Sequence, residues 1–144
     1  MAEISNVRQG KNYSVGEAGP LEALDGKLFV GQTLGFTGME VSLNRFAPGQ
    51  VVPFLHQHRR HEEMYVFIKG HGQFQVDGET FDVKPGTIVR VSPEGNRAWR
   101  NNSQDDLYCL VVQANVDSLT GQDGIRNDGP IAWPEYRRPF SQQP

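Results

Sequence analysis

Two histidines and one glutamate stand at a spacing that suits a bound metal ion. The chain reads His56-Gln57-His58, with Glu63 five residues after His58 and Gly70 seven residues after Glu63. Side chains two residues apart on a β-strand point to the same face, so His56 and His58 would lie together. Neutral imidazole and carboxylate ligands suit a borderline divalent ion such as iron, manganese, zinc, nickel or copper. We therefore predict a transition-metal site at His56, His58 and Glu63.

The sequence around this group has the pattern of consecutive short β-strands. Apolar residues alternate with polar ones, and glycine or proline turns separate the runs, which favours a sandwich or a barrel. Asp77-Gly78 is a strong hairpin signal, and Pro53 indicates an edge or a bulge. A hairpin between residues 50–58 and 64–69 would bring Glu63 to the two imidazoles. The other predicted strands are 27–30, 38–46, 73–76, 79–83, 87–91, 97–101 and 107–113.

The pattern His56-x-His58-x4-Glu63-x6-Gly70 resembles the first sequence motif of the cupin superfamily. The glycine that precedes the first histidine in that motif is represented by Gly49, one residue out of place. The resemblance covers roughly residues 38–115. It implies an all-β fold, a double-stranded β-helix or jelly-roll barrel.

The second cupin motif, Pro-x-Gly-x2-His-x3-Asn, is matched only in part. Pro93, Gly95 and Asn102 stand at the expected positions, but Ala98 replaces the histidine that would be a fourth ligand. His61 shares strand parity with Glu63 and is a candidate for the missing ligand; alternatively, it faces water in an arginine-flanked turn. Catalytic residues are not assigned by either motif.

Several residues near the two motifs are expected to line a ligand pocket inside the barrel. Tyr65 and Phe67 share parity with Glu63, and Arg100 shares parity with Ala98, which we expect to face the interior; Arg97 and Trp99 would then face outward. The predicted pocket residues are Phe54, Tyr65, Phe67, Ala98 and Arg100.

The resemblance leaves more than one function open because cupins include enzymes, storage proteins and binding proteins. One reading is a protein that binds a divalent metal and a small polar molecule, as in a metal-dependent dioxygenase. The alternative is a non-catalytic binding or sensing module with a degenerate metal site. A third reading, a cofactor-free isomerase or epimerase with a histidine base, lacks an assignable acid.

The organisation is predicted to be one domain with two appendages. Residues 1–26 would be an N-terminal arm, 27–115 the barrel and 116–144 a C-terminal extension with four prolines that exclude a long helix. In cupins such arms often wrap a second subunit, so the resemblance implies a homodimer.

The composition of the chain argues against some classes of binding partner. With 144 residues and a net charge of -3, the chain has room for one core and no basic field for nucleic acid. No apolar run is long enough for a membrane span, and the N-terminus lacks the apolar segment of a secretory signal. The single cysteine, Cys109, excludes an internal disulfide. We expect a cytoplasmic protein that contacts neither nucleic acid nor membrane.

Overall fold

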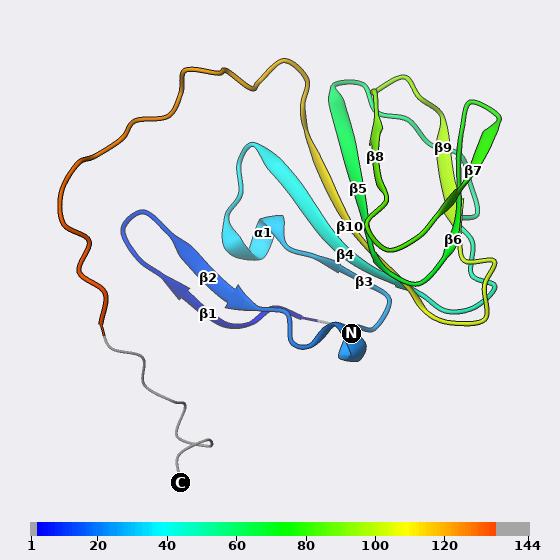
Figure 1. Ribbon diagram of the computed structural model, residues 1–144, viewed down its shortest axis with the longest axis horizontal. Helices are drawn as coiled ribbons and strands as arrows, with labels where there is room; N and C mark the ends of the chain where they lie inside the picture. Colours follow the sequence, from blue (N-terminus) through cyan, green and yellow to red (C-terminus); the bar gives the residue numbers. More distant parts are fainter. Residues whose placement is uncertain (1–2, 135–144) are drawn as a thin grey trace, which may run out of the picture.

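Two antiparallel sheets face each other in this computed structural model, which describes residues 3–134 (Figure 1). The five-stranded sheet has the order β3 (Lys27–Phe29), β4 (Met39–Phe46), β10 (Leu107–Asn115), β5 (His61–Lys69) and β8 (Ile88–Val91). The three-stranded sheet has the order β7 (Glu79–Val83), β6 (Gly72–Val76) and β9 (Arg97–Arg100). The two sheets form the predicted all-β double-stranded β-helix, or jelly-roll barrel.

The core lies between the two sheets and is built from alternate residues of each strand. Phe67 and Phe74 are completely buried, and Trp99 packs edge-on against Phe67 and flat against Phe46. Because side chains alternate along a strand, each of these residues has a polar or half-exposed neighbour on the outer face. The aromatic rings join the two sheets and fix the spacing between them.

Two turns contain residues that tolerate the positive φ angles found there. Asp77 and Gly78 both have positive φ angles, 49° and 84°, and connect β6 to β7 as the Asp-Gly signal predicts. Gly70 has a φ of 88°, and a Cβ atom there would clash with the carbonyl oxygen of Asp106. The glycine of the first motif therefore allows β5 to end directly against the start of β10.

The N-terminal region contains secondary structure that the sequence did not reveal. β1 (Ser5–Gln9) and β2 (Ser14–Glu17) pair as a hairpin beside the barrel, followed by a short 3-10 helix, η1 (Leu21–Ala23), and a helical turn, α1 (Gly31–Leu34). Every residue of β1 is exposed, so this strand has no buried face and no alternation to detect. A hydrogen bond of 2.6 Å from the Ser14 hydroxyl to the Leu34 carbonyl attaches the hairpin to α1.

The prediction of a continuous strand over residues 50–58, paired with 64–69, is wrong. This segment has only two isolated bridges, Val51 to Arg100 and His56 to Arg97, so it lies along β9. Pro53 cannot donate a ladder hydrogen bond, which is consistent with the bend in the backbone at this point. The strand that holds Glu63 begins earlier than predicted, at His61, and pairs with β8 and β10.

Beyond β10 the described chain runs away from the barrel without strand or helix as far as residue 134 (Figure 1). Residues 1–2 of the predicted arm and 135–144 of the predicted extension lie outside the described part. Among the residues described, no helix is long and apolar enough to cross a membrane.

Cys109 lies on the inner face of β10, where it is 1% exposed. Burial raises the pKa of its thiol well above the ordinary value, because the thiolate would lose its hydration. The residue is therefore a small apolar element of the core.

Replacing Phe74 with alanine tests the core. Its ring is completely buried and contacts Tyr65, Phe67 and Phe81. Phe74→Ala should lower the free energy of unfolding by about 3 to 5 kcal/mol, because it leaves a cavity between the sheets. Urea denaturation followed by tryptophan fluorescence measures this change. Phe81→Ala is the matched control, since Phe81 is 39% exposed, and an equal loss in both variants would contradict the assignment.

Candidate metal centre

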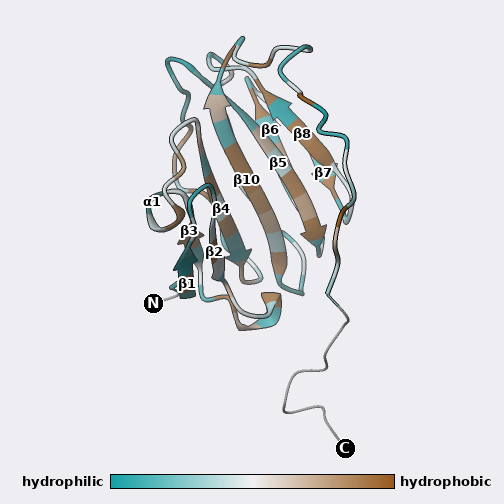
Figure 2. Cartoon of the chain, turned by 90° about the vertical axis from the view of Figure 1, so that its left-hand side faces the viewer, coloured by the Kyte–Doolittle hydropathy of each residue, from teal (hydrophilic) through white to brown (hydrophobic). Residues whose placement is uncertain are grey.

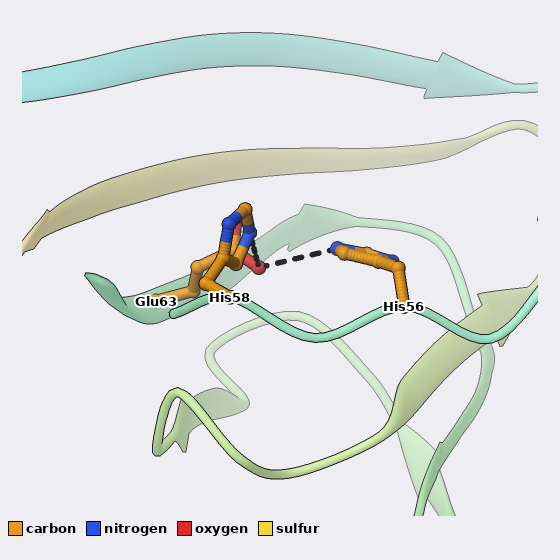
Figure 3. Close-up of side chains that lie close together, drawn as sticks. All are labelled: His56, His58 and Glu63. Carbon is orange, nitrogen blue, oxygen red and sulfur yellow. Dashed lines mark ion pairs between the residues drawn. The ribbon is translucent and has the colours of Figure 1, made fainter. Parts of the chain in front are cut away.

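The two histidines and the glutamate converge on one point inside the barrel (Figure 3). Oε1 of Glu63 lies 3.1 Å from Nε2 of His58 and 3.4 Å from Nε2 of His56. One ligand atom from each residue lies within 4.8 Å of the other two. His56 and His58 are partly buried and Glu63 is 4% exposed. The three residues thus form a candidate metal-binding triad.

Backbone hydrogen bonds position the two histidines although their segment is not a regular strand. His56 and Arg97 exchange backbone hydrogen bonds of 2.9 and 3.1 Å, and the His58 amide donates to the Pro93 carbonyl at 2.9 Å. Glu63 points inward from β5, level with Val91 on β8. His56 and His58 therefore still point to the same side, as strand alternation predicted. Their backbone pairs with β9 and with the loop before it, in place of the expected strand 64–69.

Arg97 belongs to this site, although the sequence analysis predicted that its side chain faces outward. Its side chain is completely buried, and its Nε lies 3.5 Å from Oε1 of Glu63. The guanidinium also donates to the carbonyls of His56 and Ser92 at 3.3 and 3.2 Å. It therefore provides a buried positive charge beside the triad and holds the loop that bears His56.

The predicted inward orientation of Ala98 and Arg100 is wrong. Arg97 and Trp99 face the core, whereas Ala98 and Arg100 pair with Gln75 and Gln73 on the outer face of the three-stranded sheet. Arg100 is exposed, and its Nε donates to the Gln73 side chain at 2.9 Å. Ala98 and Arg100 line a separate hollow that contains none of the triad.

The physical reason is a one-residue shift of the second motif. Arg97 and Asn101 keep the four-residue separation of the histidine and asparagine in the cupin pattern, and both are completely buried. Counted from Gly95, Arg97 stands one residue earlier than the histidine of that pattern. Trp99 was the available signal, because a tryptophan on a strand of a small barrel belongs in the core more often than an arginine does.

The surroundings of the triad shift the pKa values of two side chains, Tyr65 and His56. The Tyr65 hydroxyl donates to Oε1 of Glu63 at 2.7 Å. Burial, together with the neighbouring Glu63 charge, raises the pKa of Tyr65 far above its ordinary value, so the phenol remains a donor. Burial lowers the pKa of His56, and the positive charge of Arg97 acts in the same direction against Glu63. His56 is thereby favoured in the neutral form that a metal ligand requires.

Unpartnered polar atoms support the fit of a metal ion to this group. Nε2 of His58 is buried, has no hydrogen-bond partner and faces Oε1 of Glu63. In His56 the unpartnered atom is Nδ1, whereas Nε2 is the nitrogen that faces Glu63. Buried polar atoms are normally satisfied, so an imidazole nitrogen without a partner, aimed at a carboxylate and a second imidazole, has the character of a free ligand atom. Two imidazoles and one carboxylate are a donor set that divalent transition metals accept.

The remaining predicted site residues fall into two groups. Phe54 and Tyr65 line a cavity of about 440 Å³ that reaches His56 and Glu63, and Phe54 stands 63% exposed. Phe67 does not line this cavity; it is buried in the core against Phe74 and Trp99. His61 is not one of the converging groups, because its Nδ1 lies 2.8 Å from Oε1 of Gln113.

The cavity is bounded by both sheets and by the loop that bears His56. Its lining is largely apolar, with a few polar groups, which is the usual character of a small-molecule site. Its lining residues are Gly26, Lys27, Asn44, Arg45, Phe46, Gln50, Val51, Val52, Pro53, Phe54, His56, Glu63, Tyr65, Trp99 and Val111.

Comparisons with known proteins agree on one protein family. Residues 42–113 match the family described as cupin domain. The fold is similar to that of a cupin protein from Bacteroides fragilis, with 32% sequence identity, a TM-score of 0.75 and coverage of 82% of this chain and 99% of the other. A search of curated proteins found no match.

Two further solved structures share the fold. A predicted oxalate decarboxylase from Thermotoga maritima is 25% identical, with a TM-score of 0.51 and coverage of 53% of this chain and 65% of that one. An uncharacterized conserved protein with a double-stranded β-helix domain from Klebsiella pneumoniae subsp. pneumoniae is 18% identical, with a TM-score of 0.56 and coverage of 78% and 85%.

The contact between Glu63 and Arg97 can be tested by a double-mutant cycle. Glu63→Gln leaves the guanidinium without its carboxylate, and Arg97→Met leaves the carboxylate without its cation. Each substitution should lower the free energy of unfolding by about 3 kcal/mol, because it leaves a buried charge uncompensated. The double variant should lose less than the sum of the two. Urea denaturation in the presence of a chelator measures all four proteins, and additive losses would contradict the pairing.

Proposed function

Because the chain belongs to the cupin family, we propose that it binds one divalent transition metal through His56, His58 and Glu63. The observation that carries this proposal is the convergence of their three ligand atoms within 4.8 Å. A small polar molecule would occupy the adjoining cavity of about 440 Å³. A bound ion of this kind supplies a Lewis acid or a place for dioxygen, as in a metal-dependent dioxygenase.

The residues around the triad would position the Glu63 carboxylate and line the ligand cavity. Tyr65 and Arg97 both contact Oε1 of Glu63 and hold the carboxylate toward the imidazoles. Phe54 and Trp99 supply apolar walls of the cavity, and Gln50 supplies a polar group on its lining. These contacts orient a ligand and exclude water from one side of it.

A second candidate function is a binding or sensing module that carries little or no metal. The buried Arg97 guanidinium favours this reading, since it already gives Glu63 a positive partner. In that case the cavity alone would hold the small molecule, and the histidines would contribute hydrogen bonds. Metal analysis separates the two functions.

Metal content of the untagged protein tests the first function. Elemental analysis after dialysis against Mn²⁺ or Zn²⁺ should find one ion per chain. His58→Ala should weaken binding at least tenfold, because losing a ligand costs no less than losing an outer-shell partner. His61→Ala and His71→Ala are matched controls that should bind like the wild type. Metal-free wild-type protein that still binds small metabolites would support the second function instead.

We propose in addition that the protein forms a homodimer through the outer face of the five-stranded sheet. The strand register places four apolar side chains in one row across this face, Leu43, Leu110, Val66 and Ile88, and Leu28 continues the row on β3 but is already buried within the chain. The next row contains Val41, Val112 and Met64 and ends at Arg90 on β8, whose guanidinium is paired with Glu62 at 3.1 Å. Figure 2 looks onto this face and shows no helix or strand in front of β10, β5 and β8.

A second copy of the chain is the occupant that fits this face. The first row has no charged side chain, and the charged pair at its border, Arg90 and Glu62, is already neutralised within the chain. A two-fold axis would set the apolar row against the same row of the second copy. Strands of this length and spacing span roughly 20 by 25 Å, or on the order of 500 Å². That is a large part of the roughly 800 Å² that each partner contributes to a standard interface.

Light scattering after size-exclusion chromatography tests the dimer. The wild type should elute with the mass of two chains, and the double variant Met64→Asp/Ile88→Asp with the mass of one. Both side chains are exposed, at 39% and 64%, so neither charge disturbs the core. Leu55→Asp is the control, because Leu55 is 50% exposed outside this face. A monomeric wild type, or a dimer that survives the double substitution, would exclude this interface.

A further inference from the structure

Arg97 introduces a permanent positive charge into the interior beside the triad. Its side chain is completely buried, and its Nε has no hydrogen-bond partner. A guanidinium does not lose its proton in a protein, so this charge persists at every working pH. The nearest compensating group is Oε1 of Glu63, at 3.5 Å.

Oε1 of Glu63 faces both the two candidate ligand histidines and the Arg97 cation. It is the atom that faces Nε2 of both His56 and His58, and it is also the atom that faces Arg97. An ion held by this oxygen would lie next to the guanidinium in a poorly hydrated interior. Like charges repel more strongly there than in water, so the guanidinium disfavours the ion that the triad attracts.

The charges around the cavity do not offset this repulsion. With neutral imidazoles, a divalent ion together with Glu63 and Arg97 has a net charge of about +2. Glu63 is the one acidic residue that lines the cavity, while Lys27 and Arg45 also line it. Arg45 is paired with Asp106 at 2.8 Å, and Lys27 is exposed. The loaded site therefore has an excess of positive charge that a negatively charged ligand would neutralise.

We propose that the small ligand of this protein is an anion, such as a carboxylate, and that Arg97 makes metal and anion bind cooperatively. This inference rests on the proposed metal site and assigns the ligand class to it. The metal attracts the anion, and the anion relieves the repulsion between the metal and Arg97. Because coupling between two binding sites is reciprocal, each ligand raises the affinity of the other by the same factor.

Metal titrations with and without a small anion test the coupling. Isothermal titration calorimetry of the wild type with Mn²⁺ or Zn²⁺ is run in a sulfonate buffer, then with acetate, then with acetamide. Acetate should lower the Kd for the metal by roughly tenfold, within the range usual for coupled sites. Acetamide has the same shape without the charge and should have no effect.

Variants on β9 assign the coupling to Arg97. Arg97→Met should bind the metal more tightly than the wild type in the absence of acetate and should respond less to acetate. Arg97→Lys keeps the charge but loses the forked hydrogen bonds, so it should still respond to acetate. If Arg97 merely held the loop in place, Lys and Met would behave alike. Arg100→Met removes an exposed cation from the same strand and should behave like the wild type.

The outcomes separate this inference from the proposed function. Wild-type protein that binds the metal through His58 yet shows no response to acetate would overturn the coupling and leave the metal site intact. Failure to bind either metal would overturn the proposed site and the coupling with it. If circular dichroism shows that Arg97→Met is unfolded, the comparison of acetate with acetamide in the wild type decides the question.

Discussion

The site depends on one buried contact, in which the guanidinium of Arg97 and the carboxylate of Glu63 meet between the two sheets. Burying either charge alone would be costly, so each requires the other in the absence of a further ligand. Arg97 also donates to the carbonyls of His56 and Ser92, which ties the loop with the histidines to β9. The same contact thus compensates charge and positions the loop that bears the imidazoles.

The fold was largely predictable because its signals are local. Alternating apolar residues and the Asp77-Gly78 turn indicated most of the strands, and the spacing of His56, His58 and Glu63 indicated the candidate metal site. The β1–β2 hairpin was not predictable, since every residue of β1 is exposed and no periodicity marks it. The irregular path of 50–58 was also missed, because side-chain alternation alone does not reveal which strand a segment pairs with.

The orientation of β9 shows the limit of motif alignment. A shift of one residue in the match reverses the predicted facing of every side chain on the strand, since the side-chain period is two. The motif match predicts a lost ligand at Ala98, whereas the inward position belongs to Arg97. The site therefore has a cation where the motif match predicted an alanine in place of a histidine, and the proposed preference for an anionic ligand rests on this charge.

The buried position of Cys109 has a practical consequence. It is the only cysteine of the chain, and its side chain is 1% exposed on the inner face of β10. A cysteine introduced at the mouth of the cavity would be the sole accessible thiol of the folded protein. A fluorophore or spin label could then be attached at that one point without first removing a native residue, and distances to the cavity could be followed as ligands enter.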